Sequence, residues 1–87
     1  MKNNIKILAK AKNLHRLGNL DDAIKYYKKL LRDIKDNSQI YFLIGTAYLQ
    51  KKNYGNAYNY LLEAISLNKT IPNYFNNVGI TLSELNK

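Results

Sequence analysis

The chain has 87 residues, enough for one small domain and too few for two. It contains no cysteine, which excludes a disulfide framework, a thiolate nucleophile and a cysteine-based zinc site. Apolar residues make up 46% of the sequence, but their runs are too short to span a membrane. Lysines interrupt residues 1–14, so we expect no secretory signal there and a cytoplasmic protein.

The formal net charge of +8 arises from 14 basic and 6 acidic residues. Residues 1–37 carry most of it, with ten basic and four acidic side chains. A basic surface favours acidic partners, nucleic acid or an anionic membrane face. A solubilising lysine coat explains the same charge, and the sequence leaves both explanations open.

The first two helices are predicted from the spacing of apolar residues and from the signals at their ends. Residues 3–17 carry apolar side chains at roughly helical spacing. Gly18 ends this helix because glycine readily adopts the left-handed backbone conformation. Asn19 is predicted to cap a second helix, which has two aspartates in its first turn and ends near Ile34.

Three further helices are predicted at residues 38–51, 54–67 and 72–85. Asn37 or Ser38 is expected to cap the first of these, and Asn53 the second. Pro72 fits the first turn of the last helix, where its missing N–H has no cost. The sequence therefore predicts an all-α fold of five helices in antiparallel pairs joined by short turns.

A repeated pattern with a constant offset runs through these helices. The middle of the chain reads Tyr41-x-x-Ile44-Gly45-x-x-Tyr48 and then Ala57-x-x-x-Leu61-x-x-Ala64. The equivalent positions one period earlier hold Ala11, Leu14, Ala23 and Tyr27, and those one period later hold Phe75, Val78, Gly79 and Leu82. The offset from Ala11 to Gly45 equals the offset from Gly45 to Gly79, so the period is constant. A fixed period of this size predicts a stacked array of helix pairs.

The pattern resembles the tetratricopeptide repeat, W-x2-L-G-x2-Y followed by A-x3-F and P. The residues that match that signature are Gly45, Tyr48 and Ala57. The signature's Trp, Leu and Phe are replaced by Tyr41, Ile44 and Leu61, and its Pro by Lys69. The resemblance covers nearly the whole chain as one domain, 1–87, with repeats at about 4–37, 38–71 and a partial one at 72–87. It implies an α-solenoid, a superhelix that serves as a scaffold or adapter for protein–protein interaction.

Small residues recur in the repeats. Glycine inside a helix costs roughly 1 kcal/mol relative to alanine, so its presence at Gly45 and Gly79 indicates a packing role. We expect Gly45 to face Ala57 and to let the two helices approach closely. Ala11 and Ala23 are expected to do the same in the first repeat.

The two ends of the array differ. The middle repeat should pack on the preceding one through Ile40, Ile44 and Ala47, whereas the first repeat has polar residues at those positions, Lys6, Lys10 and Asn13. We therefore expect the first helix to be an N-terminal cap. In the third copy the same stripe is mostly apolar and should cover the middle repeat: Tyr74, Val78, Thr81 and Leu85.

The last helix also keeps the face that would meet a sixth helix, namely Phe75, Gly79 and Leu82. Imperfect covering of this face, truncation of a longer array, and a contact between copies are the three explanations. Terminal repeats usually present a polar outer face, and this one does so only in part. We therefore favour truncation or self-association, with Phe75 and Leu82 as the oligomer contact.

The resemblance implies that the first helix of each pair lines a concave groove that binds a peptide or protein segment. The implied groove residues are Leu8, Ala9, Lys12, His15 and Arg16 in the first repeat, Gln39, Phe42, Leu43, Thr46, Leu49 and Gln50 in the middle one, and Asn73, Asn76, Asn77 and Ile80 in the third. We expect none of them to be needed for the core. A bound peptide is expected to cover Phe42 and Leu49, unless Phe42 packs on Leu8.

The chemistry of these residues bears on the partner. The asparagines fit an extended peptide backbone, since an amide both donates and accepts hydrogen bonds. Lys12 and Arg16, four apart beside His15, fit a carboxylate or phosphate, or form a solvated basic face. The family's clamp for the C-terminal carboxylates of heat-shock chaperones would fall on Leu8, Lys12, Leu43, Asn73 and Asn77, none of which is the residue that clamp uses. We expect no binding of such tails through that clamp.

Signals for catalysis are missing from the sequence. His15 is the single histidine, so we expect no paired-histidine metal site. The serines lie in no nucleophile-elbow pattern and there is no glycine-rich phosphate loop, so we also expect no cofactor, no small-molecule substrate and no enzyme activity. Asp21 and Asp22 are better explained as residues of a helix start than as a catalytic pair. Nucleic-acid binding by Lys25, Lys28, Lys29 and Arg32 ranks below the protein-binding alternatives. Aromatic rings that could stack on nucleobases are few among these basic side chains, namely those of Tyr26 and Tyr27.

Overall fold

A computed structural model describes residues 2–87, which form five helices. They are α1 (Lys2–Arg16), α2 (Leu20–Asp33), α3 (Ser38–Gln50), α4 (Tyr54–Leu67) and α5 (Pro72–Leu85). The five helices predicted from the sequence are confirmed, and the predicted ends differ from the observed ones by no more than a single position.

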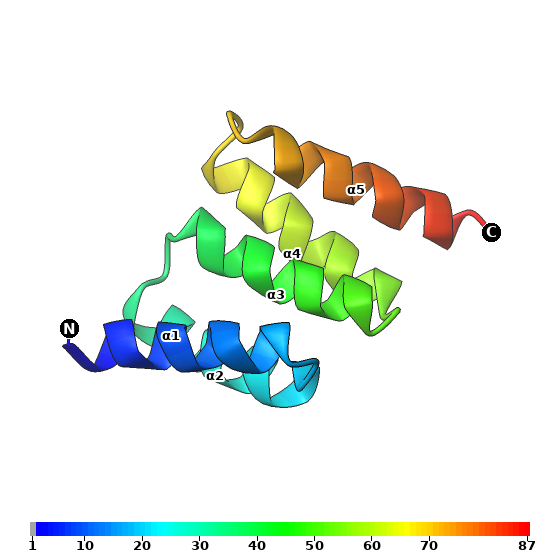
Figure 1. Ribbon diagram of the computed structural model, residues 1–87. Helices are drawn as coiled ribbons and strands as arrows, with labels where there is room; N and C mark the ends of the chain where they lie inside the picture. The colour runs from blue at the N-terminus through cyan, green and yellow to red at the C-terminus, as the bar shows by residue number, and fades with distance from the viewer. Residues whose placement is uncertain (1) are drawn as a thin grey trace.

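The helices stack as pairs in chain order. Helix α1 packs on α2 and α3 packs on α4, while α2 meets α3 and α4 meets α5. Figure 1 shows this stack rising from the first pair to α5, with α2 behind α1 and α4 behind α3. Because each pair contacts mainly its neighbours, the described part of the chain is a short helical solenoid, with extents of 41 × 26 × 18 Å.

The main core lies between the first pair and α3. Its buried side chains are Ala11, Ala23, Ile24, Tyr27, Leu30, Ile40, Ile44 and Ala47. The prediction that Ile40, Ile44 and Ala47 pack on the preceding repeat is therefore confirmed. A second set of buried residues, between the other helices, consists of Ala57, Leu61, Ala64, Tyr74 and Thr81.

Helices α3 and α4 approach each other closely at Gly45. A Cβ atom there would lie 2.7 Å from Cγ and 2.8 Å from Cδ2 of Leu61. The predicted packing role of Gly45 is correct, but its nearest neighbour is Leu61 and not Ala57. Gly79, the equivalent residue of α5, has no neighbour within 4 Å of such a Cβ in the described residues, so no packing partner for it is found there.

The predicted stripe of α5 covers the middle repeat only in part. Tyr74 and Thr81 are buried, and the Thr81 hydroxyl donates a hydrogen bond of 2.7 Å to the Asn77 carbonyl. Leu85 is 46% exposed, contrary to the prediction. The reason is visible in Figure 1, where the last turn of α5 extends past the ends of α3 and α4.

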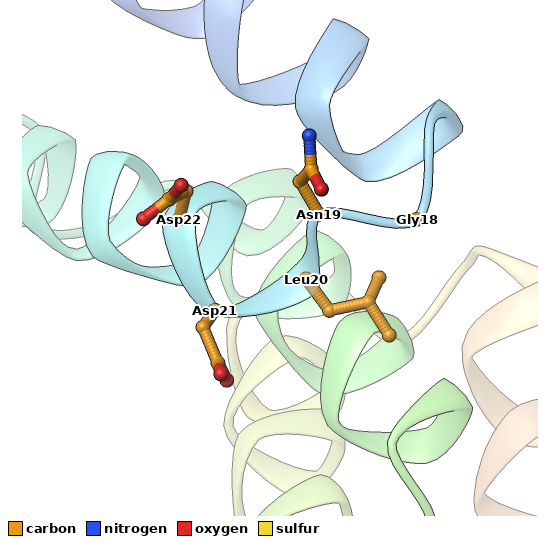
Figure 2. A pocket seen from close by; sticks show the side chains of 5 residues that line it. All are labelled: Gly18, Asn19, Leu20, Asp21 and Asp22. Carbon is orange, nitrogen blue, oxygen red and sulfur yellow. The ribbon is translucent and has the colours of Figure 1, made fainter.

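Two of the three predicted asparagine caps make their hydrogen bonds. Asn37 Oδ1 accepts from the N–H of Ile40 at 3.2 Å, and Asn53 Oδ1 accepts from the N–H of Asn56 at 3.4 Å. Asn19 occupies the N-cap position of α2, but its side chain makes no capping bond. Figure 2 shows its amide pointing toward α1 and away from the first turn of α2.

Helices α1 and α3 end in the same way, at positions separated by one repeat period. Gly18 has a positive φ of 84° and Lys52 a positive φ of 64°. In each case two bonds close the turn: Gly18 N–H to His15 O (3.0 Å) with Asn19 N–H to Leu14 O (2.9 Å), and Lys52 N–H to Leu49 O (3.0 Å) with Asn53 N–H to Tyr48 O (2.9 Å). This is the Schellman motif, which favours glycine at the left-handed residue.

Lys52 is therefore expected to be a suboptimal residue at its position. A side chain in the left-handed region costs roughly 1 kcal/mol, so Lys52→Gly should raise the free energy of unfolding by about 0.5–1 kcal/mol. Gly18→Ala should lower it by about 1 kcal/mol. Thermal unfolding would register these as shifts of several degrees, roughly 4–8 °C per kcal/mol in a domain of this size. The control is Lys52→Ala, which removes the charge but keeps Cβ; an equal gain from it would refute the backbone explanation.

Candidate functional site

The residues assigned to the groove lie on α1, α3 and α5 and fall into two groups. Those whose side chains are exposed are Ala9, Lys12, Arg16, Gln39, Gln50, Asn73, Asn76 and Ile80. Those that are half-buried are Leu8, His15, Phe42, Leu43, Thr46, Leu49 and Asn77. The half-buried residues belong mostly to α3, which is also buried on its other side through Ile40 and Ile44.

His15 connects three helices. Its Nε2 lies 2.6 Å from Oε1 of Gln50, and its Nδ1 lies 2.9 Å from the hydroxyl of Tyr27. Because a carbonyl oxygen only accepts, Nε2 donates to Gln50, and in the neutral imidazole Nδ1 then accepts from Tyr27. The structure thus brings together the predicted groove residues His15 and Gln50, with His15 as the link between α1, α2 and α3.

Tyr27 is the buried end of this link. Its side chain is fully buried, and its ring meets that of His15 edge to face at 5.8 Å. Burial raises the pKa of Tyr27 to about 12, from an ordinary value of 10.0, because the phenolate would lose its hydration. The hydroxyl therefore stays protonated and can serve as the donor that His15 requires.

Some groove residues also serve the packing of the fold, contrary to expectation. Phe42 stacks on Tyr74 of α5 with ring centroids 4.7 Å apart, and the Tyr74 hydroxyl lies 3.1 Å from that of Ser38. Leu8 and Leu43 pack against the main core. The prediction that no groove residue is needed for the core is wrong for these three. Phe42 and Leu43 lie on α3, a helix with neighbours on two sides, and Leu8 lies on the part of α1 that packs against the core.

The polar groove residues are unevenly distributed. On α1, Lys12 is exposed and Arg16 donates a hydrogen bond of 2.6 Å to Asn13 Oδ1. The ion pairs among the described residues are Lys51 with Asp21 and Lys87 with Glu84, so neither Lys12 nor Arg16 has an acidic partner in that part of the chain. The residues assigned to the groove are therefore positively charged on α1 and neutral and amide-rich on α5.

A row of tyrosine rings on α3 and α4 was missed by sequence reasoning. Tyr60 stands between Tyr48, at 5.6 Å, and Tyr41, at 6.2 Å. Lys28 of α2 lies over the Tyr48 and Tyr60 rings at 5.4 and 5.7 Å, and its Nζ donates a 2.9 Å hydrogen bond to the Tyr48 hydroxyl. That hydrogen bond raises the pKa of Lys28. Only the repeat pattern hinted at this row, through Tyr41 and Tyr48.

The hollows on the described surface include one on α3 and α4 and one before α2. One, of about 370 Å³, is lined by Tyr41, Asn59, Tyr60 and Glu63. The other, also about 370 Å³, lies at the turn before α2 and is lined by residues 18–22 (Figure 2). In the second hollow Asp21 forms an ion pair with Lys51, and Figure 2 shows the Asp21 and Asp22 carboxylates pointing apart. This geometry suits residues of a helix start and not a catalytic pair.

Neither a metal centre nor a membrane span is found in residues 2–87. Within this range no three side chains of His, Cys, Asp or Glu gather closely enough to hold an ion. Similarly, none of the helices in this range combines the length and apolar character needed to cross a bilayer.

Comparison with known proteins gives one positive result. A family model described as tetratricopeptide repeat matches residues 7–32 and 38–71, which together are more than half of the chain. No curated protein matches the chain significantly in sequence. The two matched segments cover most of α1 and α2 and all of α3 and α4, so the match and the stacking of the helices support the same architecture.

The buried Tyr27 hydroxyl predicts a loss of stability at alkaline pH. Its pKa is higher in the folded chain, so the unfolded chain releases the proton first. The stabilisation that the folded chain gains from keeping this phenol neutral is fully present below pH 10.0 and is lost as pH rises toward about 12. We expect this to lower the free energy of unfolding by up to about 2 kcal/mol. In urea unfolding across that pH range, the free energy of unfolding should fall less steeply with pH for Tyr27→Phe than for a control, Tyr54→Phe. Equal slopes for the two variants would contradict the assignment of the pH dependence to Tyr27.

Proposed function

Because the chain belongs to the tetratricopeptide repeat family, we propose that it is an adapter that binds a peptide or protein segment along the groove formed by α1, α3 and α5. Repeats of this family are non-catalytic modules for protein–protein interaction. The observation that carries the proposal is the apolar character of α3 on both sides. Its inner side buries Ile44, while Leu49 on its other side remains only half-buried.

The partner that fits this groove is an acidic, extended segment. Lys12 and Arg16 present positive charge at α1 with no acidic partner in the described residues. At the opposite end, Asn73 and Asn76 are exposed on α5 and can donate to and accept from a peptide backbone. We therefore place acidic side chains of the partner near α1 and its more neutral portion near α5.

A charge placed at the centre of the groove should abolish binding. Leu49→Glu puts a carboxylate on the half-buried surface of α3, and we expect at least a tenfold loss of affinity, about 1.4 kcal/mol. The readout is capture from a nuclease-treated lysate of the source cells, followed by quantitation of the retained proteins. Phe42→Ala is less suitable because it also removes the stack on Tyr74.

The matched control is Leu62→Glu, the same substitution at an exposed leucine of α4. Circular dichroism should show both variants folded. A protein retained by the native chain and the control, but not by Leu49→Glu, supports the groove. Equal retention by all three forms would mean that the groove is not the binding site.

Self-association through α5 is a second candidate function. Phe75 is 48% exposed and Leu82 40% exposed, and Gly79 lies between them on the same helix face with open space above it. Two copies related by a two-fold axis can place these faces against each other, since such an interface uses the same patch twice. The glycine allows the two helices to approach closely, as Gly45 allows α3 to approach α4.

Sedimentation equilibrium over a wide concentration range tests this candidate. We expect a dimer at high concentration that Leu82→Lys converts to a monomer, because the substitution buries a charge without a partner. Ile80→Lys, at a more exposed site on another face of α5, should leave the dimer intact. A monomer mass at all concentrations for the unsubstituted chain would rule the candidate out.

A further inference from the structure

The hollow lined by Tyr41, Asn59, Tyr60 and Glu63 has the chemistry of a cation site. It shares no residue with the groove and lies at the junction of α3 and α4. We propose that it binds the guanidinium of an arginine side chain presented by a protein partner. The hollow is largely open to solvent, so a side chain presented by a partner can reach it.

The aromatic walls are the first argument. Electron-rich ring faces attract cations, and tyrosine serves this role well. This chain already uses the rings in that way: Lys28 lies 5.7 Å from the Tyr60 centroid, and Lys10 lies 4.9 Å from that of Tyr26. Tyr26 is the counterpart of Tyr60 in the preceding repeat, so both copies of this position carry a cation from the chain itself. Tyr41, at the other end of the row from Tyr48, is the ring left for a cation from outside.

Glu63 supplies the second argument. It lines the hollow and makes neither of the two ion pairs found among residues 2–87, although the chain holds 14 basic residues. Its negative charge acts on the hollow, since burial first and then the charges of Glu63 and Asp36 raise the pKa of Tyr41. The nearby cation Lys28 is held at Tyr48 by its hydrogen bond, and its cation–π contacts are with Tyr48 and Tyr60.

Arginine fits these groups better than lysine does. The guanidinium is flat, stacks on aromatic faces and carries five N–H donors in a fixed fork. A carboxylate from Glu63 and an amide oxygen from Asn59 are acceptors on the same rim. An ammonium group is more strongly hydrated and has no flat face to lay on Tyr41.

The test is an NMR titration of the whole chain with N-acetyl-arginine amide, read at the ring signals of Tyr41 and Tyr60. The matched ligand is N-acetyl-citrulline amide, which has the same shape without the charge. We expect saturable shifts with arginine and at least tenfold weaker binding of citrulline. Glu63→Gln should lower arginine affinity severalfold, whereas Glu84→Gln, which removes an acid paired with Lys87, should not.

Three results would overturn the proposal: no saturable shift at Tyr41 and Tyr60, equal effects of arginine and citrulline, or equal losses in Glu63→Gln and Glu84→Gln. Leu49→Glu should leave the titration unchanged, because the groove and the hollow have no residue in common. Failure of the hollow therefore leaves the proposed groove function standing, and the reverse also holds.

Discussion

The contact between Gly45 and Leu61 sets the geometry on which the rest of this small solenoid depends. Leu61 occupies the space that a side chain at position 45 would fill. The side chain of α4 therefore packs directly on the backbone of α3, and the two helices lie closer together than they would with side chains on both. This close pairing fixes which sides of α3 remain for other neighbours. One side receives the core residues of the first pair, another receives Tyr74 of α5, and the half-buried remainder is the surface for which we propose peptide binding.

The sequence predicts the elements well because the signals that specify them are local and occur twice. Gly18 and Lys52 end α1 and α3 through the same two hydrogen bonds, and the asparagines Asn37 and Asn53 cap α3 and α4. The choice of partners between helices is a different problem. The periodicity shows which face of α3 is buried, but it does not show that Gly45 meets Leu61 and that Phe42 meets Tyr74, because those pairings depend on the angle between successive pairs.

For the candidate site too, the sequence predicts which helix carries each residue but not which residues contact each other. The family pattern places His15, Gln50 and the asparagines on three neighbouring helices, and the structure confirms that they lie on α1, α3 and α5. It gives no sign that His15 bonds to Gln50, far along the chain, or that Lys28 lies over Tyr48 and Tyr60. Such contacts join side chains from different repeats, and a single sequence records no pairing between them.

The two ends of the stack constrain how copies of the chain can meet. Lys6, Lys10 and Asn13 are exposed on α1, and Lys10 lies over Tyr26 where its counterpart Ile44 is buried in the core. A head-to-tail contact would press the apolar face of α5 onto these lysines and remove their charges from water without a partner, which is costly. A two-fold contact between α5 faces avoids that cost, since it brings Phe75 and Leu82 of one copy against the same residues of the other. If copies of this chain associate through α5, the charges on α1 therefore favour a closed dimer over an open filament.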